Sequence, residues 1–91
     1  MPTDMARAAR ELTRLLADRG LTHLRVTKRG NALTVVSGAD SDPEIRLTDL
    51  NADSWRLEVA DHRGRWEFTP FEGQLEDLVD AALSIGRLED V

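Results

Sequence analysis

The sequence contains no cysteine and no apolar run long enough to cross a membrane. Without cysteine, the chain can form no disulfide, no thiolate nucleophile and no cysteine-ligated metal site. A membrane-spanning helix needs about 20 predominantly apolar residues in a row. The first residues also lack the basic region and apolar stretch that predict a signal peptide. We therefore expect a cytoplasmic protein that has no membrane segment.

Residues that carry enzyme chemistry are also scarce. The two histidines, His23 and His62, belong to no H-x-x-x-H or H-x-E spacing of the kind that predicts a zinc site. No serine lies in a glycine-flanked nucleophile elbow, and no glycine-rich phosphate loop is present. The acidic stretch 40–44 lacks the central glycine and distal glutamate of an EF-hand loop. The sequence thus predicts no catalytic residue, no metal and no cofactor, and we expect the chain not to be an enzyme.

Acidic residues outnumber basic ones, which gives a net charge of −5 and disfavours non-specific binding to nucleic acid. Hydrophobic residues make up 41% of the chain, a share that is typical of globular proteins. A length of 91 residues is enough for one core, and no linker or repeat interrupts it. We expect a single globular domain over residues 1–91.

Two segments carry apolar residues at helical spacing. The first runs from about residue 3 to residue 19, with Thr3 as its N-cap and Gly20 as the left-handed residue that ends it. The second runs from about residue 74 to residue 85 and is ended by Gly86. Their apolar stripes are Met5, Ala8, Ala9, Leu12, Leu15 and Leu16 in the first, and Leu75, Leu78, Val79, Ala82 and Leu83 in the second.

Five short runs between these helices alternate apolar and polar residues, as strands do. They centre on Leu24 to Val26, Leu33 to Val35, Ile45 to Leu47, Trp55 to Val59 and Trp66 to Phe68. One apolar and one polar face on each run predict an antiparallel sheet that is covered on one side only. Because Trp66 and Phe68 are the large apolar residues of the last run, we expect both in the core beside Trp55. Pro70 is expected to end this run.

Together these elements predict an α+β fold in two layers: a helix, a five-strand antiparallel meander and a second helix, with both helices on one face of the sheet. This order resembles the frataxin fold, whose members bind iron on an acidic ridge of the first helix and strand. Here the corresponding surface carries basic residues instead: Arg7, Arg10, Arg14, Arg25, Lys28 and Arg29. The resemblance therefore implies topology only. It leaves a small-ligand or metal-binding regulatory domain as an alternative function.

Two charged surfaces are candidate binding sites for a partner. The first is the polar side of the last helix, where no base at helical spacing offsets the acids before Arg87; its residues are Glu72, Glu76, Asp77 and Asp80. The second is the uncovered face of the sheet, with Arg25, Arg46, Arg56 and Arg65 beside Glu58 and Glu67. Simpler explanations exist for both, because acids in a first helical turn complement the helix dipole and Arg–Glu pairs are common on solvated sheets.

The resulting prediction is a non-catalytic macromolecular-interaction protein of the immunity, inhibitor or adaptor type. It would bind a protein partner through charged surfaces, with the acidic helix, facing a basic partner, as first choice and the arginine face as second. Nucleic acid is not expected, because sheet platforms for bases need exposed aromatic side chains and these are assigned to the core. Pairing of an edge strand with a second copy would give a homodimer.

Overall fold

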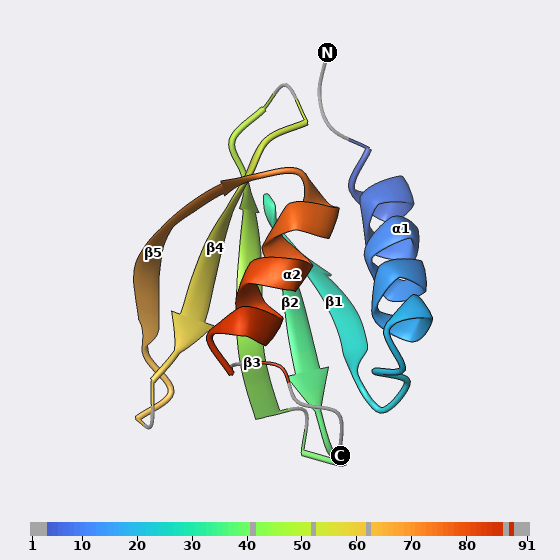
Figure 1. The fold of residues 1–91 in the computed structure, drawn as a ribbon, viewed down its shortest axis with the longest axis vertical. Helices are drawn as coiled ribbons and strands as arrows, with labels where there is room; N and C mark the ends of the chain where they lie inside the picture. The colour runs from blue at the N-terminus through green and yellow to red at the C-terminus, as the bar shows by residue number, and fades with distance from the viewer. Residues whose placement is uncertain (1–3, 41, 52, 62, 87, 89–91) are drawn as a thin grey trace.

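A computed structural model describes residues 4–40, 42–51, 53–61, 63–86 and 88. The elements along the chain confirm the predicted order of helix, five strands and helix (Figure 1). Their bounds are α1 Met5–Asp18, β1 Arg25–Arg29, β2 Ala32–Ser37, β3 Asp42–Asp49, β4 Trp55–Ala60, β5 Trp66–Gly73 and α2 Leu75–Ser84. The chain therefore has the α+β fold that the periodicities predict.

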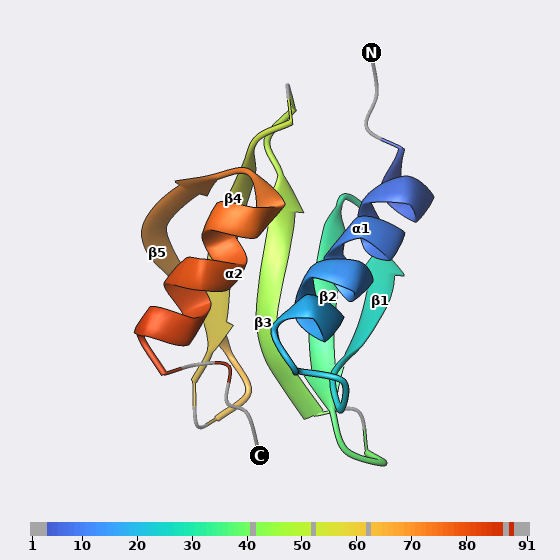
Figure 2. The same ribbon diagram turned by 45° about the vertical axis from the view of Figure 1, so that its right-hand side comes forward.

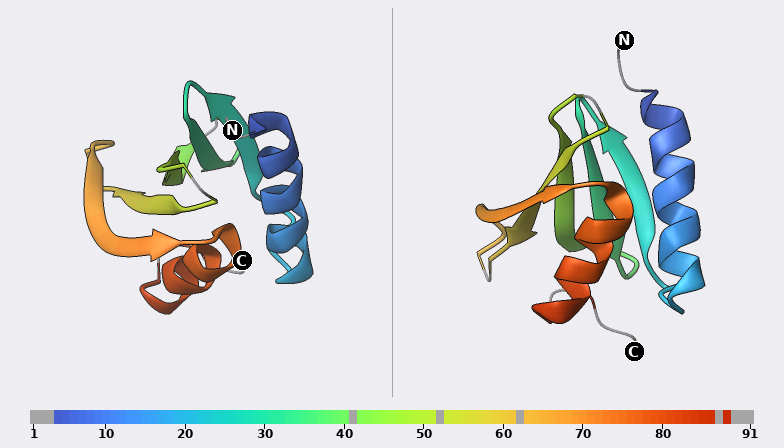
Figure 3. Two further views of the ribbon diagram at one scale, coloured as in Figure 1. Left: turned by 90° about the horizontal axis from the view of Figure 1, so that it is seen from above. Right: turned by 45° about the horizontal axis from the view of Figure 1, so that its top comes forward.

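The sheet is a meander, in which β1 to β5 lie in sequence order and every neighbouring pair is antiparallel. Both helices cover the same face: α1 packs on β1, and α2 packs on β3, β4 and β5 (Figure 2). Seen from above, the opposite face carries no helix of the described chain, and the sheet is curved rather than flat (Figure 3). The uncovered face is called the open face below.

The core lies between the helices and the sheet, because each helix turns its apolar stripe toward the apolar face of the strands. Its largest fully buried apolar side chains are Leu12, Leu16, Leu21, Leu33, Ile45, Leu47, Leu57 and Leu78. Burial of each such side chain contributes roughly 1.5–3 kcal/mol to folding. The predicted core positions in both helices and in β2, β3 and β4 are thus confirmed.

Helix α1 begins one residue later than predicted. Asp4 is the N-cap, and its Oδ1 accepts a hydrogen bond of 3.1 Å from the backbone N–H of Arg7. The predicted cap, Thr3, lies outside the described residues. At the other end Gly20 has a φ of 77°, and Leu21 donates its N–H to the carbonyl of Leu16, which is the Schellman ending expected there.

The last strand differs from the prediction in two ways, of which the first is its length. Pro70 does not end the run, since β5 continues to Gly73 before α2 begins. Proline is tolerated because β5 is an edge strand with one neighbour only, and the β4–β5 register shifts between Arg56 and Glu58. Helix α2 is one residue shorter at each end than predicted, because Gln74 and Ile85 are its caps.

The second difference is the phase of β5. Trp66 pairs with Ala60 and Phe68 pairs with Glu58, so both aromatic side chains lie on the open face instead of in the core. The reason is the preceding turn, in which Asp61 donates its N–H to the carbonyl of Arg65 and thereby places these two residues opposite each other. A shift of one residue in this register would turn every side chain of β5 to the other face.

Candidate binding surface

The strand register arranges the open face in three rows of side chains. The first row is Arg29, Ala32, Thr48, Arg56 and Glu72; the second is Thr27, Thr34, Arg46, Glu58 and Phe68; the third holds Arg25, Val36 and Pro43 on one side and Ala60 and Trp66 on the other. Cationic side chains therefore stand on β1 (Arg25 and Arg29), β3 (Arg46) and β4 (Arg56), and the aromatic side chains stand on β5. Small residues lie mainly between β1 and β5, on β2 and β3.

A groove of about 680 Å³ runs over this face and is called the open-face groove. It is lined by Thr27, Arg29, Asn31, Ala32, Thr34, Val36, Pro43, Arg46, Thr48, Glu58, Trp66 and Phe68. Ala32 and Val36 are buried although they lie outside the main core cluster. The groove therefore has an apolar floor of its own on the side of the sheet that no helix covers.

An ion pair lies in the middle row of this face. Glu58 is only 2% exposed, and its carboxylate accepts hydrogen bonds from Arg46 Nη2 and Thr48 Oγ1. The guanidinium of Arg46 lies 4.7 Å from the ring centroid of Trp66, within the range of a cation–π interaction. Sequence reasoning expected Glu58 to be solvated. Cross-strand neighbours that cover it on a curved sheet are not visible in the alternation of one strand.

A second ion pair continues the first across β4 and β5. Arg56 Nη2 lies 2.9 Å from Glu72 Oε2, and both side chains are partly exposed. The Arg56 guanidinium also lies 5.8 Å from the ring centroid of Phe68. Phe68 itself is 74% exposed, which is unusual for so large an apolar side chain. Glu72 was predicted to belong to the acidic helix surface, but it is a β5 residue and points to the opposite face.

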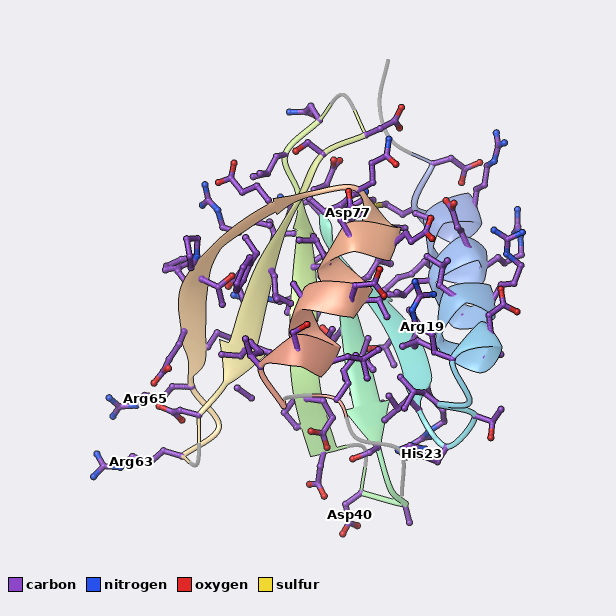
Figure 4. The ribbon with its side chains drawn as sticks, in the orientation of Figure 1. Arg19, His23, Asp40, Arg63, Arg65 and Asp77 are labelled. Atoms are coloured by element: carbon purple, nitrogen blue, oxygen red, sulfur yellow. The ribbon has the colours of Figure 1, made fainter. Side chains whose placement is uncertain are left out.

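Three of the four predicted arginines, Arg25, Arg46 and Arg56, lie on the open face as expected. Arg65 does not, because it belongs to the turn before β5, where it and Arg63 point away from the molecule (Figure 4). Glu67, which was also expected there, pairs with Val59 and has the phase of the helix-covered face.

Arg29 is the arginine that sequence reasoning left out of this surface. It pairs with Ala32 and shares the open-face phase of Arg25, and it lines the groove. Among the residues that the structure describes, it has no ion pair within 4 Å, in contrast to Arg46 and Arg56. Its alternation with Arg25 was a visible signal, but the apolar pattern centres the first strand on Leu24 to Val26 and places Arg29 after it.

The acidic side of α2 is less isolated than the sequence suggested. Arg19, the C-cap residue of α1, donates from Nε to Asp80 Oδ1 at 2.8 Å and lies 3.7 Å from Glu76 Oε1 (Figure 4). The hydrogen bond that Arg19 donates to Asp80 raises the pKa of Arg19 above its usual value, while burial acts in the opposite direction. The expectation of an acidic patch without an offsetting base is therefore wrong for Asp80 and Glu76. Asp77 lies on the exposed side of the same helix.

A second hollow of about 510 Å³ lies where both helices begin, and its charged lining is Asp4, Arg7, Glu11, Asp53 and Glu76.

Within the described parts of the chain, no three His, Asp or Glu side chains are grouped so that they could hold a metal ion. Nor does any described helix have the length and hydropathy needed to cross a membrane. His23 lies in the exposed connection between α1 and β1 (Figure 4), and His62 and Arg87 fall outside the described residues.

No family model, no curated protein and no solved structure matches this chain. What the chain binds is therefore inferred from its surfaces. Of the two charged surfaces that the sequence singles out, the open face combines a groove, an exposed aromatic side chain (Phe68) and an arginine without an ion pair in the described chain. The α2 surface combines carboxylates with a basic neighbour that partly neutralises them.

Proposed function

We propose that this chain is a non-catalytic protein-interaction module of the immunity, inhibitor or adaptor type, and that an acidic region of a partner protein docks on its open face. The exposure of Phe68, 74% on the rim of a groove, carries the proposal. Large aromatic side chains and arginine are enriched in the energetically dominant parts of protein interfaces. An exposed aromatic ring that is flanked by arginine has the composition of such a site.

Charge supports an acidic partner. The open face carries four arginines and two glutamates, and each glutamate is already bonded to one of these arginines. The chain as a whole has a net charge of −5, so this face differs in sign from the rest of the molecule. Local charge of this kind orients an approaching partner and favours one face over the others.

The acidic helix takes second place for a structural reason. Asp80 and Glu76 connect α2 to α1 through Arg19, and Glu76 and Asp77 lie in the first turn, where they complement the helix dipole. Each of these carboxylates therefore has a role in the fold. Neither Arg29 nor Phe68 has a comparable role, because neither belongs to the core or to an ion pair within the described chain.

Affinity capture from the native cell tests the proposal when a matched pair of variants is compared. Arg29→Glu with Phe68→Ser changes the open face and leaves both ion pairs in place. Arg10→Glu with Ile85→Ser makes the same change at two other exposed positions, one on α1 and one at the C-cap of α2. The wild type and the helix variant should retain the same partner, the open-face variant should lose it, and rising salt should weaken capture.

The opposite pattern would reject this surface. If reversal of charge at Glu76, Asp77 and Asp80 abolishes capture while the open-face variant retains the partner, the acidic helix is the docking surface. If the captured material is nucleic acid, the partner class is wrong.

A small-ligand-binding domain is the second candidate function, and one observation favours it. The open-face groove, at about 680 Å³, has the size of an ordinary small-molecule site. Within it the Nε of Arg46 is buried and has no hydrogen-bond partner in the described chain. A thermal-shift screen against anionic metabolites tests this function, because a ligand that binds only the folded state raises the melting temperature.

A further inference from the structure

The open-face groove has two walls of different chemistry. Thr27 and Arg29 form the wall on β1, and Trp66 and Phe68 form the wall on β5. The strip between them is made largely of small or apolar residues: Ala32, Thr34, Val36, Pro43 and Thr48. We propose that the groove holds an amphipathic acidic helix of the partner, and this proposal rests on the function proposed above.

Charge and apolar surface decide how such a helix would lie. Its apolar stripe would face Phe68, Trp66 and the floor at Val36. Its carboxylates, on the adjoining side of the helix, would face Arg29 on the opposite wall. An amphipathic helix places these two kinds of side chain on different sides of one cylinder, which matches a groove with one aromatic and one cationic wall.

The dimensions of the sheet suit a helix. Neighbouring strands lie about 4.8 Å apart, so the four steps from β1 to β5 span roughly 19 Å along the sheet. A helix with its side chains is about 10–12 Å across. Because the sheet is curved (Figure 3), β1 and β5 flank the small residues of the floor. The span between these two strands exceeds the diameter of one helix.

An extended peptide suits this face less well. The open face presents side chains and no strand edge, so the backbone of an extended segment would find no ladder to join. Hydroxyl groups in the groove are poor hydrogen-bond donors for a peptide backbone, since Thr27 already donates to the carbonyl of Thr34 and Thr48 donates to Glu58. A helix satisfies its own backbone groups and needs none of these partners.

Single-stranded nucleic acid is also disfavoured, although the exposed ring of Phe68 offers a stacking surface. Arg46 and Arg56 are bonded to Glu58 and Glu72, so two of the four arginines on this face are already neutralised. Affinity for nucleic acid depends on cations that neutralise phosphates. The carboxylate of Glu72, which also lies on β5, would instead repel the phosphate backbone of a nucleic acid.

Display selection with random 16-residue peptides tests the proposal. Peptides are selected on the full chain and counter-selected on the Arg29→Glu/Phe68→Ser variant, with Arg10→Glu/Ile85→Ser as the positive control. The expected peptides are acidic, carry apolar residues at i, i+3, i+4 and i+7, and become helical by circular dichroism on binding. Their affinity should fall by at least about tenfold on the open-face variant and stay unchanged on the control.

A spectroscopic readout places the bound peptide. In a Trp55→Phe variant, Trp66 is the remaining tryptophan, and its emission should shift when a selected peptide binds in the groove. Oligo(dT) and oligo(U) of 16 nucleotides serve as competitors, and neither should displace the peptide at physiological salt.

Each other outcome overturns the helix proposal. Selected acidic peptides that depend on Phe68 but bind in an extended conformation reject the helix and leave the proposed function standing. Peptides that bind the open-face variant as well as the wild type reject the groove itself, and with it the proposed function. A selection that recovers no binding peptide also rejects the acidic helix as occupant. So does displacement of a bound peptide by either oligonucleotide.

Discussion

At the scale of single residues, the open face is organised around a buried carboxylate. Glu58 lies on the side of the sheet that no helix covers, yet Arg46 and Thr48 bond to its oxygens and it is 2% exposed. A buried charge that is fully bonded contributes little net stability, but the loss of one partner leaves a charge that neither water nor protein stabilises. The stability of the groove should therefore depend on the pair more than on either residue.

A double-mutant cycle at this pair tests that dependence. Arg46→Met leaves Glu58 with Thr48 as its remaining bonded partner and should lower the free energy of unfolding by about 1–3 kcal/mol. Combining it with Glu58→Leu should recover most of the loss, because the buried charge is then removed as well. Urea unfolding measures both values. Losses that add in the double variant would show that the two side chains do not interact.

The two tryptophans should respond differently to truncation. Trp55 is 4% exposed in the core, so Trp55→Ala should cost about 3–5 kcal/mol and leave so small a domain largely unfolded. Trp66→Ala removes a half-buried ring on the open face and should cost far less, with the fold intact by circular dichroism. Equal losses in the two variants would place Trp66 in the core.

At the scale of elements, the β4–β5 turn decides which surface the molecule presents. Gly64, at a φ of 78°, donates to the carbonyl of Asp61, and the pairing of Asp61 with Arg65 then sets Trp66 opposite Ala60. The same strand in the other phase would bury both aromatic rings and turn Glu67 outward. The geometry of one turn thus decides whether the aromatic side chains of β5 lie in the core or on a candidate binding surface.

The contact between α1 and α2 is the second element-scale feature, and it gives a charge-swap experiment. Asp80→Arg places a cation beside Arg19 and should destabilise the fold by about 0.5–1 kcal/mol, since Asp80 is exposed and Arg19 is partly exposed. Adding Arg19→Glu restores opposite charges and should recover most of the loss. Asp77→Arg is the control, because Arg19 does not bond to it. Thermal unfolding at low salt measures the changes, and they should shrink as salt rises.

At the scale of the whole molecule, folding should not require a metal ion. The core cluster is apolar and joins both helices to the sheet, and no grouping of ligands within the described chain offers a metal site. Treatment with a chelator should therefore leave the circular dichroism spectrum and the melting temperature unchanged. A loss of structure with chelator, restored by one divalent metal, would contradict this expectation.

The whole molecule also presents two strand edges, β1 and β5. Pro70 disfavours pairing of a second chain with the β5 edge, because proline has no N–H to donate. Lys28 and Arg29 place positive charge on the β1 edge. Homodimer formation through an edge stays a prediction, with β1 as the better candidate. Sedimentation at several concentrations tests it, since a dimer through β1 should dissociate when Val26→Pro removes an edge N–H.

Much of this protein was determined by the sequence alone. Apolar spacing predicted two helices and five strands in the right order, because periodicity is a local property and short connections favour a meander. The same reasoning placed Arg25, Arg46 and Arg56 on the open face and Trp55 in the core. These residues lie in strands whose alternation has one dominant apolar phase, so no distant contact was needed to orient them.

Tertiary structure alone decided the phase of β5, the burial of Glu58 and the pairing of Arg19 with Asp80. The β5 phase depends on the hydrogen bonding of a turn, and large side chains at Trp66 and Phe68 indicated the wrong face. Glu58 is covered by side chains from a neighbouring strand, and Arg19 and Asp80 are 61 residues apart in the chain. Contacts of this kind leave no periodic signal in the sequence, because they arise only when separate elements pack together.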